Sequence, residues 1–450
     1  MTAYFVDRGW NDSGKKEKRR VVVTGIGAVT PLGNNIDETW DSLSKGRSGI
    51  GPIMRFDASR YPVKIGAEVK NFQFDSTVPE DILPFLGRST RFCLQAVKEA
   101  MESARIGSES ADPERTGISL GANEEYMGVS TMSQLFDTNS VRENLELNKA
   151  SGINNHPFPH LVTSKPLGLL WPFRKNAGTT ANILSLFYNI QGPVTTTSSA
   201  CASSAYAIGK AMRMIQDGDV DTAITGGADA MINETTLAGF YRLRTLSKNN
   251  DDPEKSSRPF DLKRDGFVLA EGAGILILEE LSHARKRKAP ILGEIVGFGT
   301  SSNAYRITAS PEDGQGVDIC MNAALRDAGC SSEDVDYINA HGTSTYLNDK
   351  SETAGIKRVF QERAYEIPVS SNKSMLGHPV ASAAAIELLI SILTLNKDVI
   401  PPTINYEYPD PECDLDYVPN EPRKRKVDTI LSNSFAFGGQ NASILVKKFV

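Results

Sequence analysis

An α/β fold with largely buried sheets is what the 450-residue sequence predicts, and three observations carry that prediction. Short apolar runs rich in β-branched residues recur along the chain, and several end in glycine, as in 20–25. Most of these runs are continuous, which is typical of strands buried on both faces. Segments with the apolar spacing of helices lie between them, and this alternation favours an α/β architecture.

The expected elements follow in chain order, with a strand wherever an apolar run leads into a turn. Two such runs, Val21–Gly27 and Ile291–Gly299, both enter glycine turns, which suggests a duplication of two α/β halves. The expected strands are 20–25, 116–122, 193–197, 222–227, 274–278, 291–298, 335–340, 429–433 and 442–446. The expected helices are 37–43, 88–104, 179–190, 202–216, 317–328, 349–360 and 381–395. Segment 148–176 is rich in proline and is expected to be irregular.

The composition fits a soluble, folded protein that does not bind nucleic acid. Hydrophobic residues make up 40% of the chain, charged residues 23%, and the formal net charge is −6. The five cysteines form no C-x-x-C pair, which fits a reducing cytoplasm. No apolar run approaches the roughly 18 residues of a membrane helix, so no membrane insertion is expected. In residues 1–20 a basic cluster follows a short apolar piece, which predicts a mobile leader and not a signal peptide.

Cys201 lies in a run of small side chains, Thr197–Ala205, between an expected strand and an expected helix. The positive end of a helix and unpaired N–H groups favour a thiolate, which is the nucleophilic form of cysteine. Small neighbours also let a substrate approach the sulfur closely. A buried, inert cysteine is the alternative, and this segment alone does not decide between the two.

Three further islands place chemical groups where strands end. His341 follows the expected strand 335–340, and Asn372–His378 ends in a second histidine just before an alanine-rich helix. Asn433–Gly439 is a phenylalanine-bearing loop that ends in a glycine pair. One thiol and two strand-end histidines suit acyl transfer. A zinc site made of these three residues is disfavoured because they lack short chelating spacing, so no metal is expected.

Taken together and in order, these and other islands resemble the β-ketoacyl-acyl carrier protein synthases, especially the elongating synthase II type. These are the condensing enzymes of fatty acid and polyketide synthesis, and the resemblance runs from about Val21 to Lys448. The matching islands are Val23–Gly27, Ser199–Cys201, Gly226–Asp229, Arg258–Asp261, Arg264–Val268, Glu271–Gly274, His341–Thr345, Lys373–Ser374, Gly377–His378, Asn433–Phe435 and Phe437–Gly439.

The resemblance implies a role for several residues in a decarboxylative Claisen condensation. Cys201 would hold the acyl chain as a thioester, and His341 and His378 would bind the carbonyl of a malonyl-type extender. Lys373 would organise the site. The N–H groups of Cys201 and Phe437 would form the oxyanion hole, with Phe437 also acting as a gate. The product would be a 3-ketoacyl-acyl carrier protein.

The resemblance also implies a thiolase-like five-layered αβαβα fold of two similar halves, 21–290 and 291–450. It implies a homodimer, with a heterodimer with a related subunit as the alternative. It implies an acidic acyl carrier protein as partner, docked at Arg88 and Arg244. No resident cofactor is implied, because phosphopantetheine arrives on the carrier. A monovalent cation near Glu387, with Asn339, Ser432 and Asn441 as companions, is a further possibility of the resemblance.

Several positions near the site depart from the family pattern. Ala436 replaces a glycine of the gate loop, Gln440 replaces threonine or histidine, and Arg306 replaces a frequent histidine. Tyr346 replaces a proline, and Pro379 opens a stretch that usually contains glycine. Because the implied catalytic groups are kept while their surroundings change, we expect a specialised synthase with an unusual acyl substrate.

Two other functions fit parts of the sequence. A thiolase-fold acyltransferase or hydrolase would keep Cys201 but would need no decarboxylation, and the presence of both His341 and His378 speaks against it. A non-catalytic subunit that determines chain length would not need Cys201, which is intact here.

Overall fold

The computed structural model describes residues 18–74, 78, 83, 86–107, 112–123 and 176–450. Its strands are β1 (Val21–Val29), β2 (Gly51–Pro52), β3 (Ile65–Gly66), β4 (Thr116–Gly121), β5 (Val194–Thr197), β6 (Thr222–Ala230), β7 (Glu271–Glu280), β8 (Gly293–Ser302), β9 (Tyr337–Asn339), β10 (Val369–Ser370), β11 (Val399–Ile400), β12 (Arg423–Lys424), β13 (Thr429–Phe435) and β14 (Gln440–Lys447).

The helices described are α1 (Ile36–Leu43), α2 (Arg88–Ala104), α7 (Thr179–Phe187), α8 (Ser203–Asp217), α9 (Glu234–Arg242), α10 (Leu281–Lys286), α11 (Val317–Ala328), α12 (Tyr346–Phe360), α13 (Lys373–Leu376) and α14 (Ala383–Lys397). Two short 3₁₀ turns, η2 (Ala200–Ala202) and η6 (Val380–Ser382), lead directly into α8 and α14.

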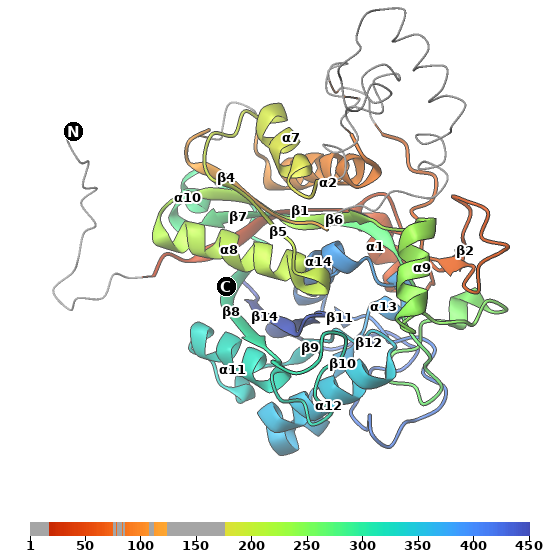
Figure 1. The fold of residues 1–450 in the computed structure, drawn as a ribbon. Helices are drawn as coiled ribbons and strands as arrows, with labels where there is room; N and C mark the ends of the chain where they lie inside the picture. Colours follow the sequence, from red (N-terminus) through yellow and green to blue (C-terminus); the bar gives the residue numbers. More distant parts are fainter. Residues whose placement is uncertain (1–17, 75–77, 79–82, 84–85, 108–111, 124–175) are drawn as a thin grey trace, which may run out of the picture.

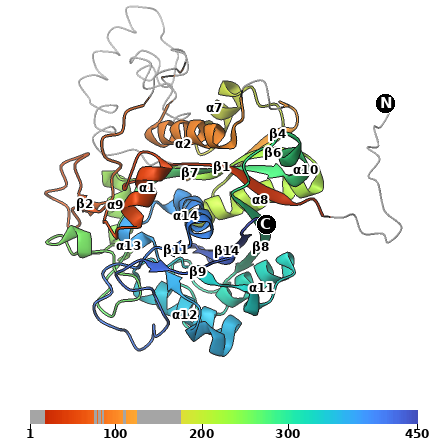
Figure 2. The ribbon, with the colours of Figure 1, turned by 180° about the vertical axis from the view of Figure 1, so that it is seen from behind.

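The elements stack in five layers, as the resemblance implies. Helices α2 and α7 cover one sheet, α8 and α14 lie between the two sheets, and α11 and α12 cover the second sheet (Figure 1; from behind, Figure 2). The central helices approach the strands closely because glycine faces them. A Cβ at Gly274 would lie 2.7 Å from the backbone nitrogen of Ile386 in α14. Both sheets therefore pack their apolar inner faces on one helical layer.

The two halves share one strand order. The full sheet runs β10-β9-β13-β14-β8-β1-β7-β6-β4-β5, joined in the middle by the short β1–β8 pairing at Val21–Val23. If the five strands of each half are numbered along the chain, their order from the outer edge of the sheet to its middle is 3-2-4-5-1. The parallel and antiparallel pairings also match. The change from one repeat to the next falls between α10 and β8.

Helix α14 has the composition of a membrane span but lies in the core. Within the described residues, the segment Val380–Lys397 has the length and hydropathy of a membrane span, with a mean hydropathy of 1.5. Its 18-residue window is 83% buried between the sheets, so its apolar character is explained by its place in the core.

The last three residues of the expected leader 1–20 are held in place. Residues 1–17 lie outside the described part of the chain, but 18–20 are held by ion pairs. Lys18 contacts Asp327 at 2.8 Å, Arg19 contacts Asp221, and Arg20 contacts Glu294 at 2.5 Å. The basic residues next to β1 thus fasten the start of the chain to both halves. Most of the proline-rich segment 148–176 also lies outside the described residues.

Candidate active site

Cys201 lies at the end of β5, inside η2 and just before α8. The preceding residue, Ala200, has a φ of 46°, so the turn is sharp and lifts residue 201 out of the strand direction. The hydroxyl of Ser203 fixes the turn, since it accepts the Ser199 N–H at 2.8 Å and donates to the Ala200 carbonyl at 2.7 Å. The cysteine is only 6% exposed.

Burial acts against the thiolate that the sequence predicts at Cys201. Burial raises the pKa of Cys201 to about 12. The charge of Lys373 and the N–H groups of Phe437 and Cys201 itself lower that pKa, but burial is the larger effect. The nucleophile must therefore lose its proton as the substrate arrives, and a base has to lie within reach.

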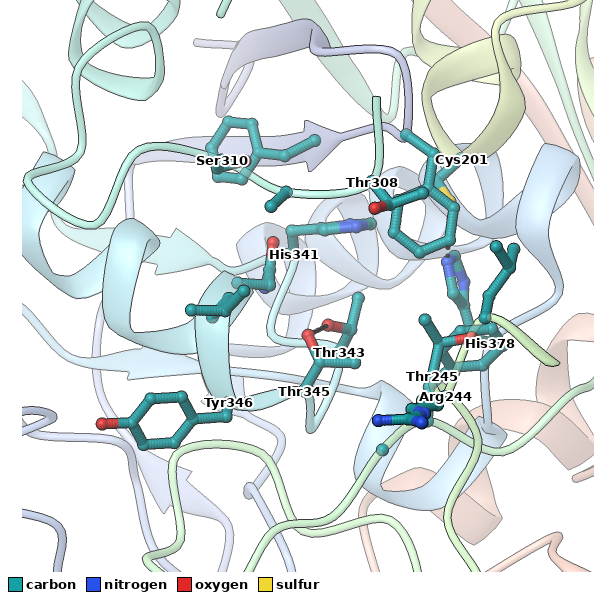
Figure 3. A pocket seen from close by; sticks show the side chains of 18 of the residues that line it. Cys201, Arg244, Thr245, Thr308, Ser310, His341, Thr343, Thr345, Tyr346 and His378 are labelled. Carbon is teal, nitrogen blue, oxygen red and sulfur yellow. Dashed lines mark hydrogen bonds between the residues drawn. The ribbon is translucent and has the colours of Figure 1, made fainter. Parts of the chain in front are cut away.

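His378 and His341 meet this sulfur from the other half of the fold (Figure 3). The Nε2 of His378 lies 3.0 Å from the Sγ of Cys201, and the two imidazole centroids are 5.4 Å apart. Burial and the charge of Lys373 lower the pKa of both histidines well below the usual value, so both rings are neutral. A neutral imidazole can accept the thiol proton or donate an N–H to an oxygen.

Lys373 links the second histidine loop to the first. Its Nζ donates to the carbonyl oxygen of His341 at 2.7 Å and forms a buried ion pair with Glu387. Burial raises the pKa of Glu387 to about 7. A buried lysine needs such a partner, and the pair connects the backbone at His341 to α14.

Glu352 holds His341 from the other side and was not singled out from the sequence. Its carboxylate, on α12, accepts the N–H of His341 at 2.9 Å and that of Gly342 at 2.8 Å. It also receives the side-chain amide of Asn433 at 3.3 Å. Burial raises the pKa of Glu352 to about 7. No sequence motif marks this contact, because Glu352 binds backbone N–H groups.

The gate loop between β13 and β14 turns at Gly438 and Gly439, whose φ values are 87° and 77°. The N–H of Gly438 donates to the carbonyl of Ile307 at 2.6 Å, so the loop rests on segment 303–310. Ala436, which replaces a family glycine, does not have a positive φ. Alanine is therefore accommodated without strain in this conformation. The ring of Phe437 packs 6.5 Å from that of Phe240.

A cavity of about 430 Å³ has Cys201, His341 and His378 at its inner end. Hydroxyl groups line much of it, and the aromatic side of the site is formed by Phe267, Phe435 and Phe437. Arginines 244, 264 and 306 also line it. Arg264 is buried and paired with Asp410 at 2.6 Å, so its charge is balanced inside the protein.

The other basic residues considered for docking lie elsewhere. Arg88 is bound through Nε and a terminal nitrogen to the buried carboxylate of Glu271, at 2.9 and 2.6 Å, and does not line the cavity. Arg88 therefore has a partner inside the protein, and its expected role in docking stays a prediction. In the basic segment 423–426, Arg423 pairs with Asp416 and Lys426 pairs with Asp428.

The proposed cation companions separate into two groups. Asn339 donates to the carbonyl of Glu387 at 3.2 Å, and Ser432 pairs with Asn339 in the β9–β13 register. The amide of Asn441 makes different contacts, since it donates to Ser301 at 3.0 Å and Asn303 at 2.7 Å. A cation held by these four residues stays a prediction.

Comparison with known proteins places these observations in a family. Residues 18–284 match the β-ketoacyl synthase N-terminal domain, and residues 292–407 match the C-terminal domain. The chain is 40% identical over 434 residues to 3-oxoacyl-[acyl-carrier-protein] synthase 2 of Coxiella burnetii, covering 96% of this chain and 99% of that protein. The protein of the same name from Synechocystis is 42% identical over 435 residues, with the same coverage.

Solved structures agree with the sequence comparison. A type II polyketide ketosynthase, solved with its acyl carrier protein and a hexaketide, is 33% identical with a TM-score of 0.82, covering 96% of this chain and all of that one. A β-ketoacyl synthase from Burkholderia phymatum is 32% identical with a TM-score of 0.81 and the same coverage. With matches along both halves and a shared thiolase-like fold, the chain belongs to the β-ketoacyl synthase family.

Proposed function

We propose that the protein is a 3-oxoacyl-acyl carrier protein synthase that elongates an acyl chain by decarboxylative condensation. The observation that carries this proposal is the meeting of one thiol and two neutral imidazoles at the inner end of one cavity. The likeness to named synthases over 96% of the chain supports the same reaction.

The first half-reaction transfers the acyl group to sulfur. His378 takes the thiol proton of Cys201, and the sulfur attacks the carbonyl carbon of the carrier-bound thioester. The carbonyl oxygen becomes negative and accepts the N–H groups of Cys201 and Phe437, both of which face the sulfur. The carrier thiolate then leaves and takes up a proton, and the acyl group remains on Cys201.

The second half-reaction forms the carbon–carbon bond. A malonyl-type extender on acyl carrier protein enters, with its thioester carbonyl near His341 and His378. The bond between its carboxylate and the neighbouring carbon breaks, and carbon dioxide leaves. The electron pair of that bond stays on the extender as an enolate, which the N–H groups of the two neutral imidazoles stabilise. The carbanion attacks the thioester on Cys201, and the thiolate is released and reprotonated. The product is a 3-ketoacyl chain on the carrier.

Lys373 and Glu352 act as positioning residues in this proposal. Lys373 holds the backbone carbonyl of His341, and Glu352 holds the N–H of the same residue. Each fixes the histidine through its main chain, so neither needs to exchange a proton with the substrate.

A carrier protein would approach at the open end of the cavity, where Arg244 and Arg306 lie. Neither guanidinium has an ion pair with the described residues, in contrast to Arg88 and Arg264. Free arginines suit the phosphate of a phosphopantetheine arm and the acidic surface of a carrier. A homodimer, or a heterodimer with a related subunit, and a cytoplasmic location remain proposals from the family resemblance.

A monovalent cation could bind beside Glu387, and buried oxygens there support this proposal. Within the described residues, Oε2 of Glu387 and Oδ1 of Asn339 are buried without a hydrogen-bond partner. Such oxygens are ligands that a hard cation accepts. The ion would bind the second carboxylate oxygen of Glu387 and would stiffen the support of His341.

The acyl substrate can be identified with a panel of acyl carrier thioesters that differ in length, branching and unsaturation. We expect a preference for an unusual chain, because residues such as Arg306, Tyr346 and Ala436 change the walls around the retained centre. A preference for ordinary saturated medium chains would reject the specialised role but leave the condensation intact.

The docking proposal is tested by the same assay with variants. Arg244→Ala and Arg306→Ala should raise the KM for carrier-bound substrates and leave the reaction with a carrier-free N-acetylcysteamine thioester unchanged. Arg88→Ala is a poor control because it breaks a buried ion pair, so the exposed Lys424→Ala serves instead. Equal effects on both substrate types would contradict docking at this rim.

A further inference from the structure

The inner end of the cavity has the composition of a soft metal site. Cys201, His341 and His378 each offer one metal-binding atom, and these atoms all lie within 4.8 Å of one another. All three side chains are buried, with exposed fractions of 6%, 1% and 1%. One thiolate and two imidazoles form a ligand set that Zn²⁺ accepts, with a fourth position left for water.

Cys201, His341 and His378 lack short chelating spacing in the sequence. The ligands come from η2, from the loop after β9 and from the turn after α13, so tertiary structure brings them together. Zinc–ligand bonds of about 2.0–2.3 Å require ligand atoms about 3.5 Å apart in a tetrahedron. The 3.0 Å contact between Cys201 and His378 and the 4.8 Å limit bracket that separation, so small side-chain shifts suffice.

No hydrogen bond at Nδ1 holds either imidazole in the described part of the chain. Among the described residues, Nδ1 of both His341 and His378 is buried without a hydrogen-bond partner, so no bond fixes either tautomer. The nearby charge of Lys373 is balanced by Glu387, and the Nζ points to a backbone carbonyl of His341. The cavity gives an ion a path from the surface.

We propose that this centre binds one Zn²⁺ or similar thiophilic divalent cation, and that the metal-bound and acylated forms exclude each other. On binding, the S–H bond of Cys201 breaks, a sulfur–metal bond forms, and the proton leaves to solvent. The two imidazole nitrogens donate lone pairs, and water fills the fourth position. No electron is transferred. This inference rests on the ligand geometry and does not require the condensation reaction.

The bound ion occupies the sulfur that the acyl group must reach, so it inhibits acylation. At a free Zn²⁺ concentration ten times the dissociation constant, the rate of acylation should fall by about tenfold. A chelator should restore the full rate, because no covalent bond to carbon has formed.

The experiment is a titration of the full-length, unacylated protein with Co²⁺, which reports on thiolate ligation through a charge-transfer absorption band. We expect one ion per chain, release of one proton in weak buffer, and displacement of Co²⁺ by Zn²⁺. Cys330→Ala is the matched control, since Cys330 is a partly exposed free cysteine outside the cavity. It should bind as the wild type does.

Cys201→Ala should lose the absorption band, and His378→Ala should weaken binding by about tenfold or more. Wild-type protein alkylated at Cys201 should also fail to bind, which tests the site without a substitution that could disturb folding. A band that persists in Cys201→Ala, or no band in wild-type protein with Co²⁺ in excess, would overturn the proposal. Acylation measured in chelator tests the proposed function separately.

Discussion

The same 3₁₀ turn occurs once in each half of the molecule, and only the copy in the N-terminal half carries the proposed nucleophile. In the N-terminal half η2 leads into α8, and in the C-terminal half η6 leads into α14, each helix being 15 residues long. Both turns open with a non-glycine residue of positive φ, 46° at Ala200 and 23° at Val380. Both are closed by the same backbone hydrogen bond, at 3.0 and 2.9 Å.

The two turns differ at their second residue, which is Cys201 in one and Ala381 in the other. The N–H of Ala381 donates to Asp229 at 2.9 Å, a carboxylate from the opposite half. The N–H of Cys201 instead faces its own sulfur, beside the N–H of Phe437. The same turn can therefore serve two purposes. It is structural where a protein carboxylate accepts the N–H of its second residue, and it can be catalytic where that N–H is left for a substrate oxygen.

Exchanging the side chains of residues 201 and 381 should have the largest effect on activity. Cys201→Ala should abolish the acyl adduct and reduce condensation by roughly 10⁴–10⁶, because the nucleophile is lost. The double variant Cys201→Ala/Ala381→Cys should remain inactive, since the donor at residue 381 is already bound by Asp229. Intact-protein mass spectrometry measures the adduct, with circular dichroism as the check on folding. An adduct on residue 381 would show that the turns are interchangeable.

Both histidines come from the half that lacks the thiol, and their separate roles in the two half-reactions can be tested. His341→Ala should slow carbon dioxide release by about 10²–10³ through loss of one N–H donor, and leave acylation of Cys201 near the wild-type rate. His378→Ala should slow both steps, because this ring also contacts the sulfur. Single-turnover assays with labelled malonyl carrier separate the two rates. Equal loss of acylation in both variants would reject the division of roles.

The pH dependence of thiol alkylation tests the state of the catalytic turn. Because burial raises the pKa of Cys201 to about 12, the thiolate fraction should rise by about tenfold per pH unit through pH 8 to 10. Iodoacetamide labelling of Cys201, followed by peptide mapping, measures that slope. A plateau below pH 8 would mean that the helix end overcomes burial and stabilises the thiolate.

Loss of the hydrogen bond between Ala381 and Asp229, in the turn without the thiol, should lower the free energy of unfolding. Asp229→Ala leaves the buried N–H of Ala381 without this acceptor, and a buried unpaired donor costs about 1–3 kcal/mol. Denaturant unfolding should show this loss, while Thr236→Ala, a buried hydroxyl without a partner in the described part of the chain, should cost less. Unchanged stability in Asp229→Ala would mean that the bond to residue 381 is not a support of the turn.

Much of this architecture could be predicted from the sequence, because it depends on local patterns. Apolar runs ending in glycine located the long strands, and helical spacing located α2, α8, α11 and α14. The short strand β10 and helix α9 were missed. Strand β10 has only two residues, too few to show a period, and its pairing with β9 is a tertiary contact.

For the site, the places of some residues could be predicted from the sequence, but their separations, partners and burial could not. Cys201, His341 and His378 follow strand ends, so their places could be inferred, but their separation depends on how the halves stack. The ion pair of Arg88 could not be inferred, because its partner, the buried Glu271, lies 183 residues away. Burial acts against the thiolate expected at Cys201, and burial is not visible in a run of small residues. Glu352 acts on backbone N–H groups, and such contacts leave no motif.

The most direct test of the account follows the protein mass through one turnover. Wild-type protein mixed with an acyl carrier thioester should gain the acyl mass on Cys201 and lose it when malonyl carrier is added, with release of carbon dioxide and a 3-ketoacyl carrier. His341→Ala should gain the adduct and keep it. An adduct that discharges without malonyl carrier, or one that maps to another residue, would contradict a condensing centre built from one sulfur and two imidazoles.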